Sequence, residues 1–223
     1  MTDLTPDLQA RLAQLGSATV YEAQGQRGAV DERIKPIDAS MTLVGPALTV
    51  DAGPADNLML HAALHHARPG DVLVVDAHGF DRAGAWGDVL TAAAQRIGIA
   101  GLVIDGAVRD AAQIVQAGFP VFARGLSIRG TTKTYRGTVG EPIDLAGLTV
   151  RRGDVIVGDR DGLVVIPADG LHRSLELAEK RETAETVHRR RIADGAFTSE
   201  LLGLTDTLHR YFGAAAVPVG VTG

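Results

Sequence analysis

The sequence reads VLVVD at residues 72–76, WGDVLTAAAQRI at residues 86–97 and LVID at residues 102–105. The first and last of these segments are short and apolar, as is typical of buried strands. In the middle segment apolar residues recur at the spacing of one helix face, and these are Trp86, Val89, Leu90, Ala93, Ala94 and Ile97. Residues 77–85 contain two glycines and are predicted to form a loop. Together the segments predict a right-handed βαβ unit with parallel strands.

The rest of the chain continues this alternation. Helical patterns cover residues 6–15, 18–24, 55–67 and 110–117, whereas residues 41–51 and 120–123 favour strands. Glycines punctuate residues 127–167, which predicts short antiparallel or mixed strands that include 154–157 and 163–166. A long charged helix is expected from residue 168 to about residue 193, within a C-terminal helical extension over 168–223. Because no Pro/Ser-rich linker divides the chain, residues 1–223 predict a single domain.

The composition excludes several classes of protein. Of 223 residues, 45% are hydrophobic and only 4% aromatic, which favours a core of small aliphatic residues in a helix-covered sheet. The net charge of −5 argues against an electrostatic nucleic-acid partner, and the absence of cysteine excludes thiolate catalysis. No apolar run approaches the ~20 residues that span a bilayer, and Met1–Pro6 has no signal-peptide pattern. We therefore expect a cytoplasmic protein with neither a nucleic-acid nor a membrane partner.

Asp88 is followed, after twenty residues, by Arg109-Asp110. Asp88 falls at the start of the predicted helix, and Arg109-Asp110 falls just after the strand that returns from it. Both should therefore lie at the carboxyl edge of the sheet, where open α/β sheets bind ligands. An Arg-Asp pair by itself is more typical of a structural ion pair, but its shared edge with Asp88 favours a site.

These residue types suit a 2-oxo acid. The amides of Gly87, Asp88, Val89 and Leu90 open a helix, which is a natural seat for a carboxylate. Arg109 offers a bidentate fork, and Asp110 offers a hard oxygen ligand of the kind that Mg²⁺ or Mn²⁺ takes alongside water and substrate.

Asp-x20-Arg-Asp resembles the signature of the 4-hydroxy-4-methyl-2-oxoglutarate (4-carboxy-4-hydroxy-2-oxoadipate) aldolases. These are metal-dependent class II pyruvate aldolases that share a fold with the regulator of ribonuclease E activity A. The resemblance spans about residues 17–195 and rests on four further segments. They read GDVLVVD from residue 70, GLVIDGAVRD from residue 101, RGTTK from residue 129 and GDRDGLVVIP from residue 158. The fold that it implies is an α/β/α sandwich of the swivelling-domain type, with a central mixed sheet and a C-terminal helical arm, assembled as homotrimers or homohexamers.

The resemblance also implies roles for individual residues. Asp110 would bind Mg²⁺ or Mn²⁺ directly, and Arg109 would contact the carboxylate or enolate oxygen of the substrate. Asp88 would hold a metal-bound water and assist proton transfer, while the amides of residues 87–90 would hold pyruvate. A glutamate of a neighbouring subunit's C-terminal helix would reach the metal through water. Glu185 fits this role best, Glu182 lies one turn away, and a solvated helix face explains either residue equally well.

The implied activity is cleavage of a 4-hydroxy-2-oxo acid to pyruvate, with oxaloacetate decarboxylation as a second activity. The alternative is a non-catalytic regulator that binds ribonuclease E. Because regulators in this family lack the acid after the arginine, Asp110 favours the enzyme. A lyase for another oxo acid remains open. His78 could meet the substrate. His61 and His65 have the spacing of a possible metal pair, but helix packing or partial exposure is favoured for them. Lys133 is the candidate for Schiff-base catalysis, and ion pairing or solvation is favoured for it.

Overall fold

The structure is a computed structural model that describes residues 4–213. Its helices are α1 (Pro6–Ala23), α2 (Leu58–His66), α3 (Asp88–Ile97), α4 (Ala111–Gln116), α5 (Leu171–Ala193), α6 (Thr198–Leu201) and α7 (Thr205–Phe212), with a 3₁₀ turn at Ala168–Gly170. Its strands are β1 (Lys35–Pro36), β2 (Leu43–Asp51), β3 (Val72–Trp86), β4 (Gly101–Val108), β5 (Val121–Leu126), β6 (Ile143–Leu145), β7 (Leu148–Val150), β8 (Val155–Gly158) and β9 (Leu163–Ile166).

Seven strands form one mixed sheet in the order β1-β5-β4-β3-β2-β8-β9. Strands β2, β3, β4 and β5 are parallel, as expected for consecutive βαβ connections, whereas β1, β8 and β9 run antiparallel to their neighbours. Strands β6 and β7 form a separate antiparallel pair. The prediction of short antiparallel or mixed strands after residue 127 is therefore confirmed.

The sheet curves toward a barrel because the chain before β1 also pairs with β9. Val30 N–H donates to the Leu163 carbonyl at 3.0 Å, and Val165 N–H donates to the Gly28 carbonyl at 2.8 Å. This segment then leads into β1 on the opposite edge of the sheet. The two edges are thus bridged by one short piece of chain.

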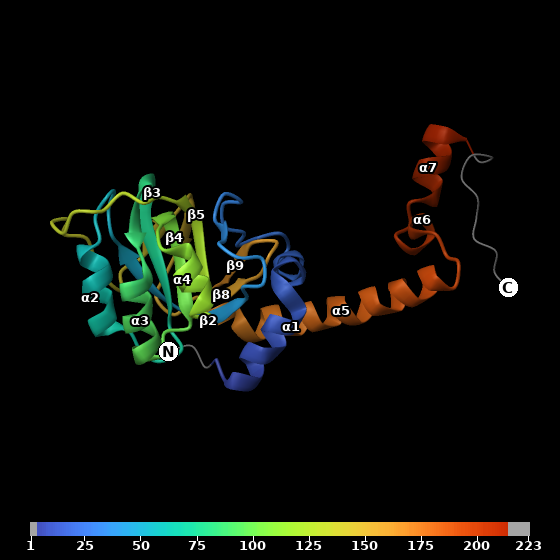
Figure 1. Ribbon diagram of the computed structural model, residues 1–223. Helices are drawn as coiled ribbons and strands as arrows, with labels where there is room; N and C mark the ends of the chain where they lie inside the picture. Colours follow the sequence, from blue (N-terminus) through green and yellow to red (C-terminus); the bar gives the residue numbers. More distant parts are fainter. Residues whose placement is uncertain (1–3, 214–223) are drawn as a thin grey trace. The chain divides into compact units, whose positions relative to one another are not determined.

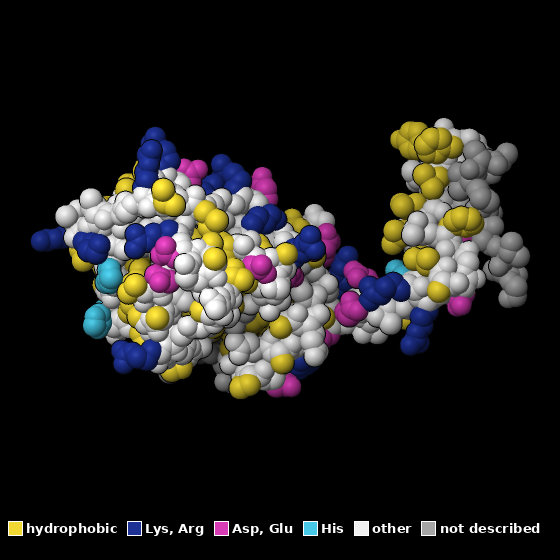
Figure 2. Space-filling view, viewed as in Figure 1, with side chains coloured by type: hydrophobic (Ala, Val, Ile, Leu, Met, Phe, Trp, Pro, Cys, Tyr) yellow, Lys and Arg dark blue, Asp and Glu magenta, His cyan; other side chains and the backbone are white. Residues whose placement is uncertain are grey.

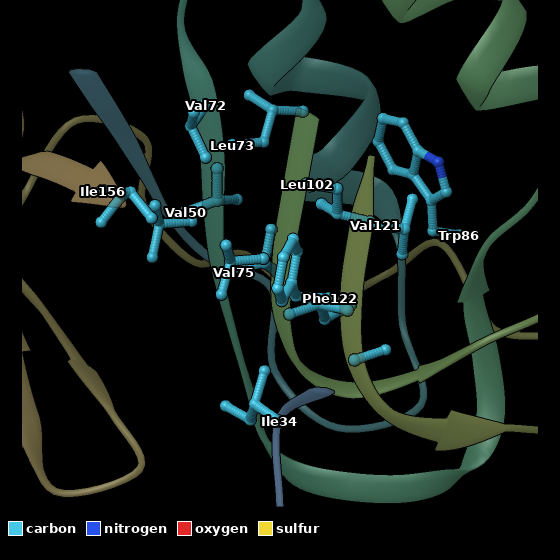
Figure 3. Packing of buried hydrophobic residues seen from close by; sticks show 14 of the residues in the cluster. Ile34, Val50, Val72, Leu73, Val75, Trp86, Leu102, Val121, Phe122 and Ile156 are labelled. Atoms are coloured by element: carbon cyan, nitrogen blue, oxygen red, sulfur yellow. The ribbon is translucent and has the colours of Figure 1, made fainter. Parts of the chain in front are cut away.

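Two hydrophobic clusters hold the helices to this sheet. The larger cluster joins α2, α3 and α4 to the parallel strands, and Figure 3 labels members of it from Ile156 on one side of the view to Trp86 on the other. In the smaller cluster α1 and the first turns of α5 cover β8 and β9. Its buried members are Leu12, Val20, Val44, Val155, Val157, Val164, Ile166, Leu171, Leu175 and Ala178. The predicted α/β architecture with a central mixed sheet and a C-terminal helical part is confirmed (Figure 1).

Two predictions inside the βαβ unit are wrong. Residues 77–85 are not a loop, because β3 runs on to Trp86 with irregular register against β4. Helix α3 therefore begins at Asp88 rather than at Trp86, and Trp86 is a buried strand residue. Val89 is 72% exposed although it fits the apolar pattern. The pattern was misleading because a bulged strand can place apolar side chains at irregular intervals.

Helix α1 is kinked at Gly16, whose φ of 78° is outside the helical range. After the kink, Ser17 donates from both its N–H and its hydroxyl to the carboxylate of Asp159. Asp159 also accepts from Asp161 N–H at 2.9 Å, so the DRDG segment is a turn that caps the second half of α1.

The chain divides into two compact units, Met1–Ala178 and Glu179–Gly223. The sheet and helices α1–α4 belong to the first unit, and the described part of the second unit is helical. The single-domain organisation stays a prediction. Within residues 4–213, no helix is both long and apolar enough to cross a membrane.

Candidate active site

The βαβ unit brings the predicted site residues together. Trp86, the last residue of β3, is the register partner of Val108, the last residue of β4. Arg109 N–H then donates to the Trp86 carbonyl at 2.8 Å. The start of α3 and the Arg109-Asp110 pair are therefore adjacent, as the twenty-residue spacing indicates.

The two carboxylates at this edge are held by local contacts. Asp110 Oδ2 lies 3.3 Å from Arg109 Nε and accepts a long hydrogen bond of 3.4 Å from Asp88 N–H. Asp88 Oδ1 accepts from Val89 N–H at 2.8 Å. Two of the four amides at the start of α3 thus already face carboxylates. Asp110 has a φ of 55°, a conformation that a non-glycine residue adopts only at some cost in backbone energy.

Gly87 fits closely between the site residues. A Cβ atom at this position would lie 2.5 Å from Asp110 Oδ2 and 3.1 Å from Arg109 Nε. The φ of −154° is accessible to any residue, so the requirement for glycine is one of space. Arg109 and Asp110 can therefore lie against the start of α3 only because Gly87 has no side chain.

A cavity of about 320 Å³ opens at this point. Its walls come from β3, the start of α3, Arg109, the residues beside the start of α2, and the loop after β5. The lining residues are Asn57, His61, Gly84, Ala85, Trp86, Gly87, Val89, Leu90, Arg109, Gly130, Thr131 and Lys133. Asp88 and Asp110 do not line the cavity themselves. Each directly follows a lining residue in the chain, Asp88 after Gly87 and Asp110 after Arg109.

The loop after β5 is anchored by Asp56. This carboxylate is buried, with only 2% of the residue exposed. Its Oδ2 accepts from the Thr132 hydroxyl at 2.6 Å and from Thr134 N–H at 2.7 Å, and its Oδ1 accepts from Leu58 N–H at 2.8 Å. Lys133 is thus held at the cavity by tethers on both of its neighbours. Figure 1 shows this loop running from β5 across β3 toward α2, and basic side chains gather over that region in Figure 2.

The contacts of Asp56 also explain its titration. Burial by itself would raise the pKa of this carboxyl. The hydrogen bonds from Thr132 and from the backbone amides of Leu58, Thr134 and Tyr135 outweigh burial and lower the pKa to about 2. Asp56 is therefore ionised at neutral pH and acts as a fixed acceptor for the loop.

Asn57 and Trp86 form the part of the wall between α2 and α3. Asn57 Nδ2 donates to the Ala85 carbonyl at 3.2 Å, whereas its buried Oδ1 has no hydrogen-bond partner within residues 4–213. Such an orphaned acceptor in a cavity wall is available to a ligand or a water molecule. Trp86 is fixed by a 2.8 Å hydrogen bond from its Nε1 to the Thr91 hydroxyl.

His78 belongs to a different cluster and does not line the cavity. Its Nε2 lies 3.0 Å from Asp51 Oδ1, and its N–H donates to Asp76 Oδ1 at 2.7 Å. Asp51 also accepts from the Tyr135 hydroxyl at 3.0 Å. Burial raises the pKa of Asp76 above its ordinary value. The hydrogen bond and charge of His78 partly oppose this rise, and nearby Asp105 and Asp51 add to it. The suggestion that His78 meets substrate finds no support in this geometry.

The carboxylates at this edge of the sheet are the potential ligands of a metal ion. Within the described part of the chain, no group of three or more His, Asp or Glu side chains could enclose a metal ion. Asp110 nevertheless offers a half-exposed carboxylate beside Arg109, and the Asp88 carboxylate is exposed nearby. One or two carboxylates completed by water and substrate suit Mg²⁺ or Mn²⁺, which keep much of their hydration, better than Zn²⁺. The residues present therefore fit such an ion.

Glu182 and Glu185 lie on α5 in the second compact unit. Glu185 forms ion pairs with Arg181, at 2.9 Å, and with Arg189, at 3.6 Å. Glu182 pairs with Arg189 and also accepts from the Thr186 hydroxyl. Their contribution to the site of a neighbouring subunit stays a prediction.

Several cavity residues have no role in the sequence-based prediction. The sequence gives no role to Asn57, to Thr131 or to Asp56, which anchors the loop. It favours packing or partial exposure for His61 and ion pairing or solvation for Lys133. The only sequence signal was the RGTTK segment at residues 129–133, which supports the family resemblance without indicating a contact with α2. That contact joins residues 76 positions apart, which no local pattern reveals.

Comparisons with known proteins assign the chain to a family. Residues 17–165 match the family described as "RraA-like: Aldolase/RraA". A relative from Halalkalibacterium halodurans, named "Putative 4-hydroxy-4-methyl-2-oxoglutarate aldolase", is 40% identical over 161 residues, which cover 72% of this chain and 77% of the relative.

Solved structures give the same assignment. An uncharacterized protein from Pseudomonas syringae pv. tomato superimposes with a TM-score of 0.79 at 25% identity, covering 90% of this chain and 99% of the other. Streptomyces coelicolor RraAS2, described as an unusual member of the RNase ES inhibitor RraA family, gives a TM-score of 0.74 at 29% identity and covers 84% of this chain and 98% of its own. By sequence and by fold, the chain belongs to the RraA-like (Aldolase/RraA) family.

Proposed function

We propose that the protein is a divalent-metal-dependent class II pyruvate aldolase. It cleaves 4-hydroxy-4-methyl-2-oxoglutarate or a similar 4-hydroxy-2-oxo acid and also decarboxylates oxaloacetate. The observation that carries the proposal is the Arg109-Asp110 pair, which lies against Gly87 at the wall of a cavity. The aldolase name of the relative from Halalkalibacterium halodurans supports the same reaction class.

The cavity suits a substrate with two carboxylates. Arg109 and Lys133 both line it, and they come from different elements. Arg109 lies beside the start of α3, where the partial positive charge of the helix also favours an anion. We assign the pyruvate half of the substrate to Arg109 and the amides of Gly87 and Leu90, and the distal carboxylate to Lys133.

Mg²⁺ or Mn²⁺ would be held directly by Asp110 and through water by Asp88 and by Glu185 of a neighbouring subunit. When bound, the ion would polarise the 2-keto group of the substrate. The chain's own residues position the substrate and handle charge. Arg109 holds the oxygen on which negative charge develops, and Asp88 assists removal of the proton from the C4 hydroxyl. The C3–C4 bond then breaks, leaving a carbonyl product and pyruvate enolate, which is protonated at C3 to give pyruvate.

Homotrimers or homohexamers are part of the same proposal. Leu126, the last residue of β5, and Ile128, at the start of the cavity loop, are 61% and 95% exposed. Exposed apolar side chains beside a site are typical of a subunit contact. Light scattering coupled to size-exclusion chromatography would measure the assembly, and a monomeric mass at micromolar concentration would contradict it.

A coupled pyruvate-release assay tests the reaction. The panel contains oxaloacetate and 4-hydroxy-2-oxo acids, each with Mg²⁺, with Mn²⁺ and after EDTA treatment. We expect turnover that EDTA abolishes and Mg²⁺ restores. Arg109→Ala should lower kcat about a hundredfold, since one preorganised donor to an oxyanion contributes ~3 kcal/mol. EDTA-resistant turnover would contradict the class II assignment.

The second candidate is a non-catalytic regulator of ribonuclease E. It is favoured by the names of two structural relatives, the Streptomyces RraAS2 and the RNA-processing inhibitor RraA from Thermus. The superposition on the Thermus protein covers 92% of that protein's chain. Tight binding to ribonuclease E in a pull-down, together with no pyruvate release from any substrate, would favour this function over the aldolase.

A further inference from the structure

A second hollow of about 900 Å³ lies in the first compact unit and shares no lining residue with the active-site cavity. Three segments form it: the end of α1 with the loop after it, the turn between β7 and β8, and the chain from β9 into α5. Four of its lining residues are arginines, namely Arg27, Arg151, Arg152 and Arg173. We call this hollow the arginine groove.

Polar side chains brace the groove. Gln24 Nε2 donates to the Val165 carbonyl at 3.2 Å and to the Arg27 carbonyl at 3.1 Å, while Gln24 Oε1 accepts from the Ser174 hydroxyl at 3.1 Å. Gln24 therefore ties the end of α1 to both β9 and α5.

Asp154 provides the second brace. Its carboxylate is 7% exposed and accepts from Arg151 N–H at 2.8 Å and from Ala168 N–H at 3.0 Å. These bonds join the β7–β8 turn to the start of the C-terminal helical part. Hydrogen bonds thus join all three walls, and the segments that carry the arginines are held in place before a ligand binds.

The guanidinium groups of the groove form no ion pairs in the part of the chain that the structure describes. Asp154 and Asp169 are the acidic residues in the lining, and the Asp154 carboxylate is already bound to backbone amides. The groove therefore keeps a surplus of positive charge in a chain whose net charge is −5.

We infer that the arginine groove binds a small ligand that carries two or more phosphate groups. Arginine forks match phosphate oxygens bidentately, and several forks around one hollow suit several phosphates. The volume falls within the range of about 300–1,000 Å³ that is usual for small-molecule sites. A nucleic-acid partner would call for a basic surface on a basic domain, which the net charge of −5 opposes. This inference does not rest on the proposed aldolase function.

Isothermal titration calorimetry with inorganic pyrophosphate and tripolyphosphate, at low ionic strength, tests the inference on the full-length protein. We expect saturable binding that weakens as salt is added, because the contacts are ionic. The double variant Arg151→Gln/Arg152→Gln and the single variant Arg173→Gln should each bind at least tenfold more weakly. Arg96→Gln is the matched control, since Arg96 is exposed on α3 and outside the groove, and its affinity should stay within twofold.

Three results would overturn the inference. Absence of saturable binding by the wild-type protein, or equal loss of affinity in the groove variants and in Arg96→Gln, would overturn it. Tighter binding of a single-stranded RNA oligonucleotide that pyrophosphate cannot displace would also overturn it, in favour of nucleic acid. Thermal unfolding of each variant verifies folding, and unchanged pyruvate release in the groove variants would separate this site from the active site.

Discussion

Gly87 shows how a single residue controls the candidate site, because a Cβ atom there would lie 2.5 Å from Asp110 Oδ2. Gly87→Ala should therefore displace Asp110 and Arg109 while leaving the extended backbone unstrained. We expect kcat to fall at least tenfold, with a change of less than about 1 kcal/mol in the free energy of unfolding, since the added methyl meets side-chain atoms rather than backbone. Pyruvate release and urea denaturation would measure the two quantities.

Gly125→Ala is the matched control for this substitution. Gly125 lies in β5, and a Cβ atom there would meet no heavy atom within 4 Å. Its activity should stay close to that of the wild-type protein. Wild-type activity in Gly87→Ala would contradict the close approach of the Arg109-Asp110 pair to the start of α3.

Lys133 provides a second prediction at the scale of one residue. If its ammonium group binds the distal carboxylate, Lys133→Met should raise KM for a dicarboxylic 4-hydroxy-2-oxo acid about tenfold or more. It should have little effect on a substrate whose distal group is uncharged. Steady-state kinetics with the two substrates would measure this difference. An equal loss of kcat on both substrates would instead indicate a role of Lys133 in the chemical step.

At the scale of an element, the loop after β5 depends on Asp56. Asp56→Ala removes an ionised acceptor of hydrogen bonds from Leu58, Thr132, Thr134 and Tyr135. Hydrogen bonds to charged groups contribute about 1.5–3 kcal/mol each in favourable cases, and the cost of burying the carboxylate offsets much of that sum. We expect the protein to lose about 2–3 kcal/mol of stability and KM to rise as Lys133 becomes mobile. Asp56→Asn, which keeps one acceptor oxygen, should recover part of both losses. Urea denaturation and steady-state kinetics would measure them.

The pH dependence of the Asp56 contribution has a definite sign. Its pKa of about 2 in the folded protein lies below the ordinary value of 3.8, so the folded state favours the ionised form. The stabilisation is complete above pH 4 and is lost as the pH falls toward 2. The difference in stability between wild type and Asp56→Ala should shrink over that range. A constant difference would show that the effect arises from packing rather than from the charge.

At the scale of the whole molecule, aspartates on three neighbouring strands place charge inside the sheet. Asp51 and Asp76 are register partners in β2 and β3, and Asp105 follows on β4. Because burial raises the pKa of Asp76, the folded protein holds its proton at pH values where the unfolded chain has lost it. Ionisation of Asp76 therefore lowers stability as the pH rises.

Asp76→Asn should accordingly stabilise the protein at pH 7.5, and the gain should disappear as the pH approaches the ordinary range of aspartate near 4. The asparagine side chain retains an oxygen that can accept from His78 N–H. Asp38→Asn is a contrasting control, because hydrogen bonds from Ser40 lower the pKa of Asp38 and its replacement should cost stability at neutral pH. Urea denaturation at several pH values would measure both, and destabilisation of Asp76→Asn at pH 7.5 would contradict the effect of burial.

Much of the fold and part of the site follow from the sequence alone. Apolar periodicity predicts most of the elements, and the Asp88-x20-Arg109-Asp110 spacing predicts that both segments meet at one edge of the sheet. These predictions succeed because they depend on residues close in sequence or on the regular geometry of one βαβ unit. The glycine requirement at Gly87 and the continuation of β3 to Trp86 lie beyond such patterns, because they depend on how two segments of the chain approach each other in space.

The tertiary structure decides which residues complete the cavity and where charge gathers. Asp56 meets Thr132 across 76 positions, and Gln24 meets Ser174 across 150. Local propensity carries no information about such pairs, since they form only when the sheet brings distant segments together. For this reason the sequence indicates the Arg109-Asp110 pair, whereas only the packed molecule reveals the anchored Lys133 loop and the arginine groove.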